Sequence, residues 1–291
     1  MAAMAATGTR TRGAVALTLT SIISVQTGSA LATGLFDQLG PIGTVFLRAL
    51  FGALLLLALV RGAPLRARRW PHRNVVLLGL AVAGVNIFFF AALDRLPLGI
   101  TVTLEFVGPL GVALLGSRHR RDVVWALLAA VGIVLLTNGG GSGIDALGVV
   151  LALVAGICWG AYIVQSDRVG AVEPGVSGAA MAAVISAVVV APFGIAQGGS
   201  ALLDPAHLAV AAVIGLLSTA VPYVFEMEAL RRLPRATFGV LMSLEPAVAA
   251  AIGFIALSQD LTAVEILAIA LVVIASAGAL RSAATPPPHD S

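Results

Sequence analysis

Ten apolar runs, each close to the length that crosses a bilayer, follow one another along the chain with short polar segments between them. A transmembrane α-helix needs about 20 consecutive, predominantly apolar residues. The runs cover residues 14–33, 41–60, 74–93, 98–116, 123–137, 146–165, 176–197, 207–228, 237–257 and 263–280, of which 123–137 is the shortest. The pattern predicts an all-α integral membrane protein with ten transmembrane helices.

Two stretches of the chain repeat one pattern 137 positions apart. Residues 92–97 read ALDRLP, residues 229–234 read ALRRLP, and Pro109 corresponds to Pro246. Each half contains five predicted spans, an odd number, so the second half must enter the membrane from the opposite side. Repeats of inverted topology are typical of secondary transporters, which bind substrate near the midplane between the repeats. We expect a first five-helix repeat at 14–138, a second at 146–281 and a disordered tail at 282–291.

Three prolines inside the apolar runs are expected to break their helices: Pro109, Pro222 and Pro246. Proline has no amide hydrogen, so the carbonyl four residues earlier loses its helical donor. For Pro222 that carbonyl belongs to Ser218. For Pro109 it belongs to Glu105, which puts a carboxylate and a free backbone acceptor at one level of an apolar helix. Such a pair is tolerated inside protein or beside a cavity, but not against lipid.

Glu105 and Arg48 are two charged residues that the sequence places inside predicted spans. Ionisable side chains inside a membrane are candidates for function. Each lies about seven residues from one end of its apolar run, and these two ends are expected on the same side of the membrane. At 1.5 Å per residue both side chains are then roughly 10 Å deep. We expect them either to pair or to hold the two ends of a zwitterion. A purely structural ion pair is the alternative.

Seven further residues are candidates for a substrate or proton pathway: Gln26, Asn86, Trp159, Tyr162, Tyr223, Glu226 and Glu245. Asn86 and Tyr223 are 137 positions apart and therefore equivalent in the two halves. Trp159 and Tyr162 could stack over an ammonium group, but aromatic rings in a span more often pack against other helices or anchor at the membrane–water interface. For Glu245 the alternative is a carboxylate that caps the broken helix. For Glu226 it is an acid that pairs with a loop arginine, which is what we expect of Glu228.

The composition supports a membrane protein and narrows its chemistry. The chain is 59% hydrophobic and 11% charged, with a mean hydropathy of +1.04, whereas a soluble domain has roughly 25% charged residues. All 17 basic residues are arginines, which we attribute to compositional bias, and no nucleic-acid partner is expected. The single cysteine excludes an intramolecular disulfide. There is no Walker-type P-loop, HExxH or CxxC motif, so neither ATP-driven transport nor a metal or other cofactor is expected, and no clustered site suggests an enzyme.

Arginines gather on one set of loops, and this predicts the orientation. Cytoplasmic loops carry the excess of basic residues. One set holds Arg61, Arg66, Arg68, Arg69, Arg73, Arg118, Arg120, Arg121, Arg168, Arg231, Arg232, Arg235 and Arg281, and the other holds Asp37, Asp94, Asp145, Asp204 and Asp260 with Arg95. We expect a multi-pass protein of the bacterial inner membrane with both termini in the cytoplasm. The sequence Ala30-Leu31-Ala32 is similar to a signal-peptidase site, but cleavage there would break the five-plus-five arrangement.

Several motifs resemble those of the bacterial threonine/homoserine exporters, in the EamA branch of the drug/metabolite transporter superfamily. They are LEFVGP at 104–109 with Ser117-Arg118 and Val124-Trp125, LSTAVPY at 217–223 with Glu226-Met227, RLPRATFG at 232–239 and MSLEPA at 242–247. The resemblance covers residues 14–280 and implies ten helices in two inverted EamA repeats, an inner-membrane location and proton-linked efflux of small amino acids. Glu228 departs from the family pattern, which has an apolar residue there.

The leading interpretation is a secondary transporter that exports threonine, homoserine or related small amino acids by proton antiport and alternating access. Its expected partners are the amino acid, protons and the lipid bilayer, and a homodimer is left open. One alternative is export of another metabolite or a drug. The other is a non-transporting membrane scaffold, which predicts that Glu105 and Arg48 can be replaced without loss of phenotype.

Overall fold

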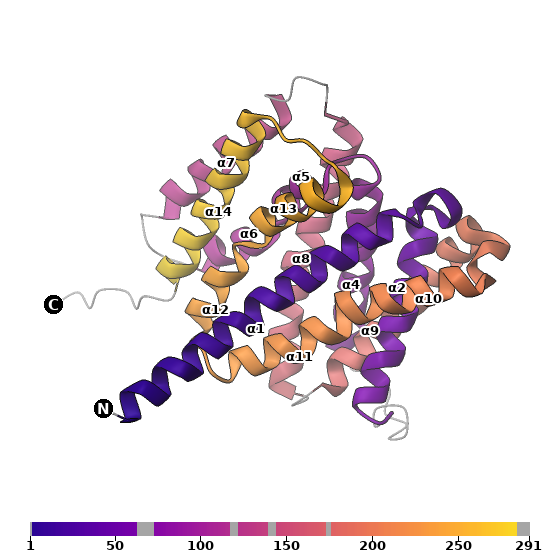
Figure 1. Ribbon diagram of the computed structural model, residues 1–291, viewed down its shortest axis with the longest axis horizontal. Helices are drawn as coiled ribbons and strands as arrows, with labels where there is room; N and C mark the ends of the chain where they lie inside the picture. Colours follow the sequence, from indigo (N-terminus) through magenta and orange to yellow (C-terminus); the bar gives the residue numbers. More distant parts are fainter. Residues whose placement is uncertain (1, 63–72, 117–121, 139–143, 173–175, 284–291) are drawn as a thin grey trace.

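The chain folds into a single bundle of helices. The computed structural model describes residues 2–62, 73–116, 122–138, 144–172 and 176–283, and these residues form helices and their connecting turns only (Figure 1). In chain order the elements are α1 (Ala2–Thr33), α2 (Phe36–Leu59), α4 (Arg73–Leu93), α5 (Leu98–Glu105), α6 (Val107–Gly116), α7 (Asp122–Asn138), α8 (Ala146–Val172), α9 (Ser177–Gly198), η1 (Gly199–Leu203), α10 (Pro205–Gly215), the π-helical turn η2 (Leu216–Ala220), α11 (Val221–Leu230), α12 (Arg235–Met242), α13 (Glu245–Leu257) and α14 (Ala263–Ala283).

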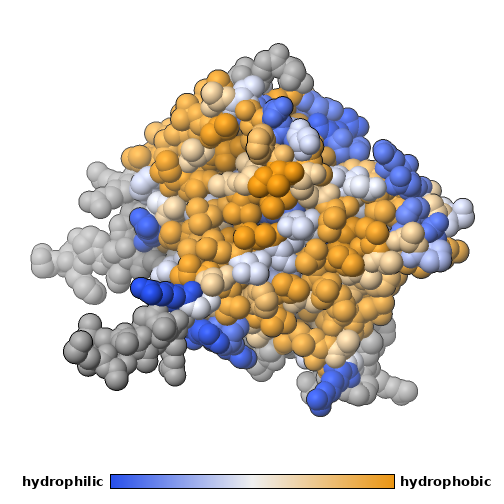
Figure 2. Space-filling view, in the orientation of Figure 1, coloured by the Kyte–Doolittle hydropathy of each residue, from blue (hydrophilic) through white to orange (hydrophobic). Residues whose placement is uncertain are grey.

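Nine helical segments in the described part of the chain are long and apolar enough to cross a membrane. A further apolar helix at Val123–Thr137 is shorter, as the sequence predicts for that run. The surface agrees, because apolar side chains cover most of the visible face and polar ones gather at its edges (Figure 2). Leu115, for example, is 91% exposed. The prediction of an all-helical membrane protein is confirmed at this level.

The second span begins earlier than the apolar run suggests. We expected it to start at residue 41, but α2 starts at Phe36 and contains a kink at Gly40, whose φ is +68°. The Gln197 side chain of α9 occupies the place where a Cβ on Gly40 would lie. Its Oε1 accepts hydrogen bonds from the backbone N–H groups of Ile42 (2.7 Å) and Gly43 (3.1 Å). A residue 155 positions from Ile42 in sequence thus caps the helix after the kink, which no local pattern can predict.

Helix pairing joins the two halves of the chain. In the first half α4 packs against α8 and α9 of the second half, and correspondingly α10, η2 and α11 pack against α1 and α2. The pairs α2–α9 and α7–α14 bring corresponding helices of the two halves together, and α5 packs against α13. The bounds of α5, shifted by 137 positions, coincide with those of α12. Each half therefore completes the packing of the other, and the space between them is bordered by both.

The connecting segments meet at two ends of the bundle. At one end Arg95 forms an ion pair with Asp145 at 2.8 Å, and the same carboxylate accepts from the first amides of α8. The hydrogen bond from Arg95, followed by one from the backbone of Gly148, holds the pKa of Asp145 below its usual range. At the other end the guanidinium of Arg232 lies beside Gly13. The arginines at 66, 68, 69, 118, 120 and 121 and the predicted tail from residue 284 onward lie outside the described residues.

Candidate functional site

Two helices are interrupted at equivalent positions in the middle of the bundle. In the first half α5 ends at Glu105 and α6 begins at Val107, and in the second half α12 ends at Met242 and α13 begins at Glu245. Pro109 is the third residue of α6 and Pro246 the second residue of α13, positions where a missing amide hydrogen is tolerated. Glu105 therefore lies at the carboxyl end of one short helix, and Glu245 at the amino end of another.

The break between α5 and α6 is held against α8 by glycines. A Cβ on Gly156 of α8 would come within 2.6 Å of the carbonyl oxygen of Glu105. A Cβ on Gly108 of α6 would overlap the carbonyl oxygen of Gly156. The carbonyl released by Pro109 thus faces a bare stretch of α8 rather than lipid. Glycine is required at both positions because only a missing side chain permits this approach.

Pro222 lies just after a π-helical turn, and side chains from two other helices bind the carbonyls near it. Pro222 is the second residue of α11 and follows η2. The carbonyl of Ser218, four residues before it, accepts a hydrogen bond from Nη2 of Arg48 at 3.5 Å. The carbonyl of Leu217 accepts one from Oγ of Ser24 at 2.7 Å. Such π-turns are frequent at functional sites, and here side chains of α1 and α2 supply donors to two of its carbonyls.

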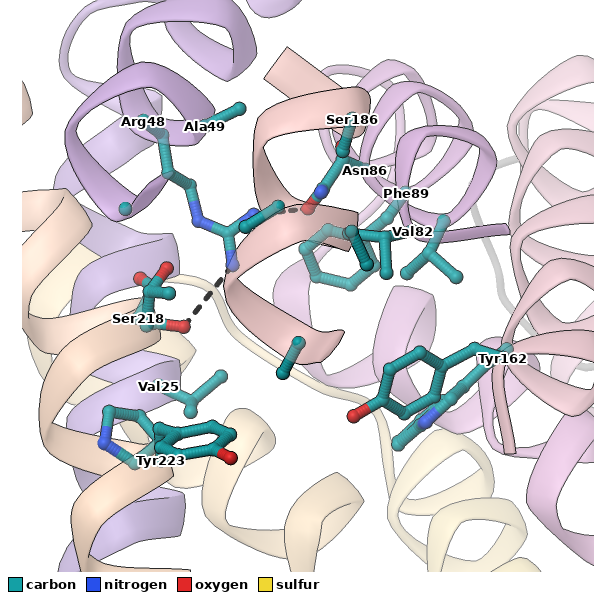
Figure 3. A pocket seen from close by; sticks show the side chains of 18 of the residues that line it. Val25, Arg48, Ala49, Val82, Asn86, Phe89, Tyr162, Ser186, Ser218 and Tyr223 are labelled. Carbon is teal, nitrogen blue, oxygen red and sulfur yellow. Dashed lines mark hydrogen bonds between the residues drawn. The ribbon is translucent and has the colours of Figure 1, made fainter. Parts of the chain in front are cut away.

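A cavity of about 380 Å³ lies between the two halves. Its walls come from α1, α2, α4, α5, α8, α9, η2, α11, α12 and α13. All nine pathway candidates from the sequence line it: Gln26, Arg48, Asn86, Glu105, Trp159, Tyr162, Tyr223, Glu226 and Glu245. In Figure 3 the hydroxyl groups of Tyr162 and Tyr223 face the central space from opposite sides. The volume is within the range of small-molecule sites.

Arg48 is anchored in the wall of this cavity. Its Nη1 donates a hydrogen bond to Oδ1 of Asn86, and its Nη2 donates to Ser218 (Figure 3). The guanidinium carbon lies 5.2 Å from the ring centroid of Phe90, a cation–π contact. The buried Nε has no hydrogen-bond partner. The Nε–H of Arg48 is thus left without an acceptor in the protein, although Nη1 and Nη2 each have one.

Arg48 and Glu105 line the same cavity, but they do not form the ion pair that the sequence left open. The ion pairs of the described residues include none between them. Glu105 is 6% exposed, and its carboxylate has no hydrogen bond to another described residue. A buried positive charge and a buried negative charge therefore face one space without neutralising each other directly. Both are costly to leave unpaired.

Glu226, Glu228 and Glu245, three acids of the second half, lie in different surroundings. Glu245, also 6% exposed, has no hydrogen bond to another described residue. Glu226 lines the cavity and accepts a hydrogen bond from Oγ of Ser21 at 2.6 Å. Glu228 lies outside the cavity lining and pairs with Arg231 and Arg232, as expected from the sequence. The neighbouring acids 226 and 228 are thus divided between the interior and the end of the bundle.

Several lining residues were not apparent from the sequence. Ser218 and Ser186 line the cavity, and the hydroxyl oxygen of each is buried without a partner. A lone serine in an apolar run is common, so only the packing of η2 and α9 identifies these two. Trp159 was a candidate for stacking over an ammonium group. Its ring packs edge-to-face on Phe106 at 5.4 Å, the residue between α5 and α6, so it also supports the helix break.

Comparisons with known proteins agree on the kind of molecule. Residues 146–281 match the model of the EamA-like transporter family. The chain is 41% identical to the threonine/homoserine exporter RhtA of Salmonella typhimurium (strain LT2) over 262 residues, which is 89% of this chain and 88% of the relative. It is 40% identical to RhtA of Escherichia coli (strain K12) over 266 residues, 91% of this chain and 90% of that protein. A crystal structure with 22% identity matches 91% of this chain and 96% of its own with a TM-score of 0.64, which supports the fold alone.

Proposed function

The chain belongs to the EamA-like transporter family, and on that premise we propose that it exports threonine, homoserine and similar small amino acids from the cytoplasm. The relatives that cover nearly the whole chain are exporters of these two amino acids by name. The observation within this chain that supports the proposal most is that Arg48 and Glu105 line one cavity without forming an ion pair. An amino acid carries one charge for each of them.

Arg48 and Glu105 are proposed to hold the two charged ends of the amino acid. The substrate carboxylate accepts from the buried Nε of Arg48, which is without a partner in the protein. Guanidinium groups suit carboxylates because their donors are planar and fixed. The substrate ammonium donates to Glu105, and Tyr162 and Tyr223 supply hydroxyl groups for the polar side chain of the substrate. Binding then satisfies groups that the protein alone leaves unpaired.

Counterflow tests the substrate directly. Proteoliposomes that contain the purified full chain are loaded with unlabelled threonine, homoserine or a control such as leucine or glutamate, and labelled homoserine is added outside. We expect threonine and homoserine inside to drive transient accumulation of the label, and the controls to have little effect. If neither drives accumulation while a different metabolite does, the proposed substrate class is wrong.

We also propose ten membrane spans in two inverted repeats, with both termini in the cytoplasm of a bacterium. The shared bounds of α5 and α12 and the reciprocal packing of the halves support a repeat. The family model matches residues 146–281, the expected extent of the second repeat. Arg95 and Asp145 belong to the set of loops that carries the aspartates, and their ion pair supports placing these two loops on one side. The tenth span is the short helix α7.

A pair of reporters tests this topology. A reporter fused after Arg281 is expected to give a cytoplasmic signal, because the arginines predict that side. A reporter inserted into 138–145 is expected to give a signal from the far side. Both reporters on one side would contradict the ten-span inverted repeat, whatever the substrate.

For the driving force we propose exchange with protons at Glu105. None of the four histidines lies deep in a predicted span, so the carboxylates in the cavity are the groups available to take up and release a proton. Glu105 would be neutralised by the substrate ammonium in one state and by a proton in the other. Alternating access would then need only the relative motion of the two halves around this cavity.

A further inference from the structure

The cavity contains more hydrogen-bond acceptors than a neutral amino acid can satisfy. The described residues that line it include three carboxylates, Glu105, Glu226 and Glu245, but Arg48 is their one basic side chain. Neither Glu105 nor Glu245 has a hydrogen bond to another described residue, and Glu226 has one, from Ser21. Threonine or homoserine brings a single ammonium group, which accounts for one of the three acids.

Gln26 of α1 adds an independent sign of a missing donor. Its side chain is 2% exposed and lines the cavity, and its Oε1 has no hydrogen-bond partner. A buried acceptor without a partner costs roughly 1–3 kcal/mol. The amide is neutral, so its need for a donor does not depend on the charge of the carboxylates. The acceptors of Gln26 on α1, Glu226 on α11 and Glu245 on α13, called the acidic wall below, therefore favour a ligand group with several N–H donors.

Arg48 limits which ligands with such a group fit the cavity. The guanidinium favours a carboxylate, so a simple diamine would leave its Nε without an acceptor. A ligand that satisfies Arg48, Glu105 and the acidic wall carries one carboxylate and two ammonium groups. In such a ligand the α-carboxylate would lie at Arg48, the α-ammonium at Glu105, and the second ammonium would reach the acceptors of the remaining lining residues Glu245, Glu226 and Gln26.

We propose that the cavity also binds short diamino acids, of which 2,4-diaminobutyrate and ornithine are the simplest. 2,4-Diaminobutyrate has the skeleton of homoserine, with an ammonium group in place of the hydroxyl. The proposal rests on the proposed function for the position of the α-carboxylate and α-ammonium. It goes beyond that function because it assigns the acidic wall to the side chain of the substrate.

Homoserine and 2,4-diaminobutyrate form a matched pair of probes for this assignment. Binding of each, labelled, to the purified full chain and counterflow of each in proteoliposomes are measured for the unaltered protein and for Glu245→Gln, which keeps the shape but removes the charge. A matched control is Glu265→Gln, because Glu265 is also a buried acid but lies outside the cavity lining. We expect Glu245→Gln to weaken binding of 2,4-diaminobutyrate at least tenfold more than that of homoserine, and Glu265→Gln to leave the ratio unchanged.

Three results distinguish the proposals. If the unaltered protein binds and moves homoserine but not 2,4-diaminobutyrate, the second ammonium site is wrong and protons must neutralise the acidic wall. An equal loss of both ligands in Glu245→Gln, by binding as well as by counterflow, also overturns it. If the protein moves 2,4-diaminobutyrate but neither homoserine nor threonine, the diamino-acid site stands and the proposed function is wrong.

Discussion

Replacement of Arg48 by alanine is expected to raise the half-saturating concentration for threonine and homoserine by about 100-fold. Removing one partner of a buried, hydrogen-bonded charge pair costs about 2–5 kcal/mol, and each 1.4 kcal/mol is a factor of about ten. Arg48→Lys keeps the charge but loses the planar fork, so we expect an intermediate defect. The measurement is counterflow of labelled homoserine at a series of concentrations.

Two controls separate binding by Arg48 from its structural role. Arg95→Ala removes an arginine whose side chain is 40% exposed in an ion pair with Asp145, and it should have little effect on transport. Ser24→Ala removes the hydrogen bond to the carbonyl of Leu217 and so disturbs η2 without removing a charge. If Ser24→Ala reproduces the Arg48→Ala defect in full, Arg48 acts by holding η2 and not by binding substrate.

The helices could be predicted from the sequence because their signal is local. Apolar runs and prolines are properties of neighbouring residues, so the pattern alone predicts the broken helix at 98–116 and the interruption near Pro222. The capping of α2 after its kink could not be predicted, because Gln197 of α9 supplies it from the other half of the chain.

The candidate residues could also be found from the sequence, whereas their partners could not. A charge such as Glu105 or Arg48 inside an apolar run is conspicuous, and the cavity lining includes both. The bond from Arg48 to Asn86 and that from Ser21 to Glu226 join residues 38 and 205 positions apart. Such pairs depend on how helices pack. The sequence therefore left open whether Arg48 pairs with Glu105, and the fold decides against an ion pair.

Replacement of Glu105 by glutamine is expected to abolish efflux driven by a pH gradient. Glutamine preserves the size of the side chain and still accepts a hydrogen bond from an ammonium group, so exchange of substrate without a gradient should persist at a reduced rate. It cannot take up and release a proton, so the proposed coupling of proton entry to substrate exit would be lost. Glu228→Gln is a suitable control, because Glu228 pairs with Arg231 and Arg232 outside the cavity lining.

The central claim, that protons drive amino-acid export through Glu105, is tested by one measurement. Proteoliposomes loaded with labelled homoserine are shifted to a medium that imposes a pH gradient, and efflux is followed for the unaltered chain, Glu105→Gln and Glu228→Gln. We predict that the gradient accelerates efflux in the unaltered chain and in Glu228→Gln, and that it has no effect in Glu105→Gln. Full gradient-driven efflux by Glu105→Gln would contradict the claim and move the proton site to Glu245 or Glu226.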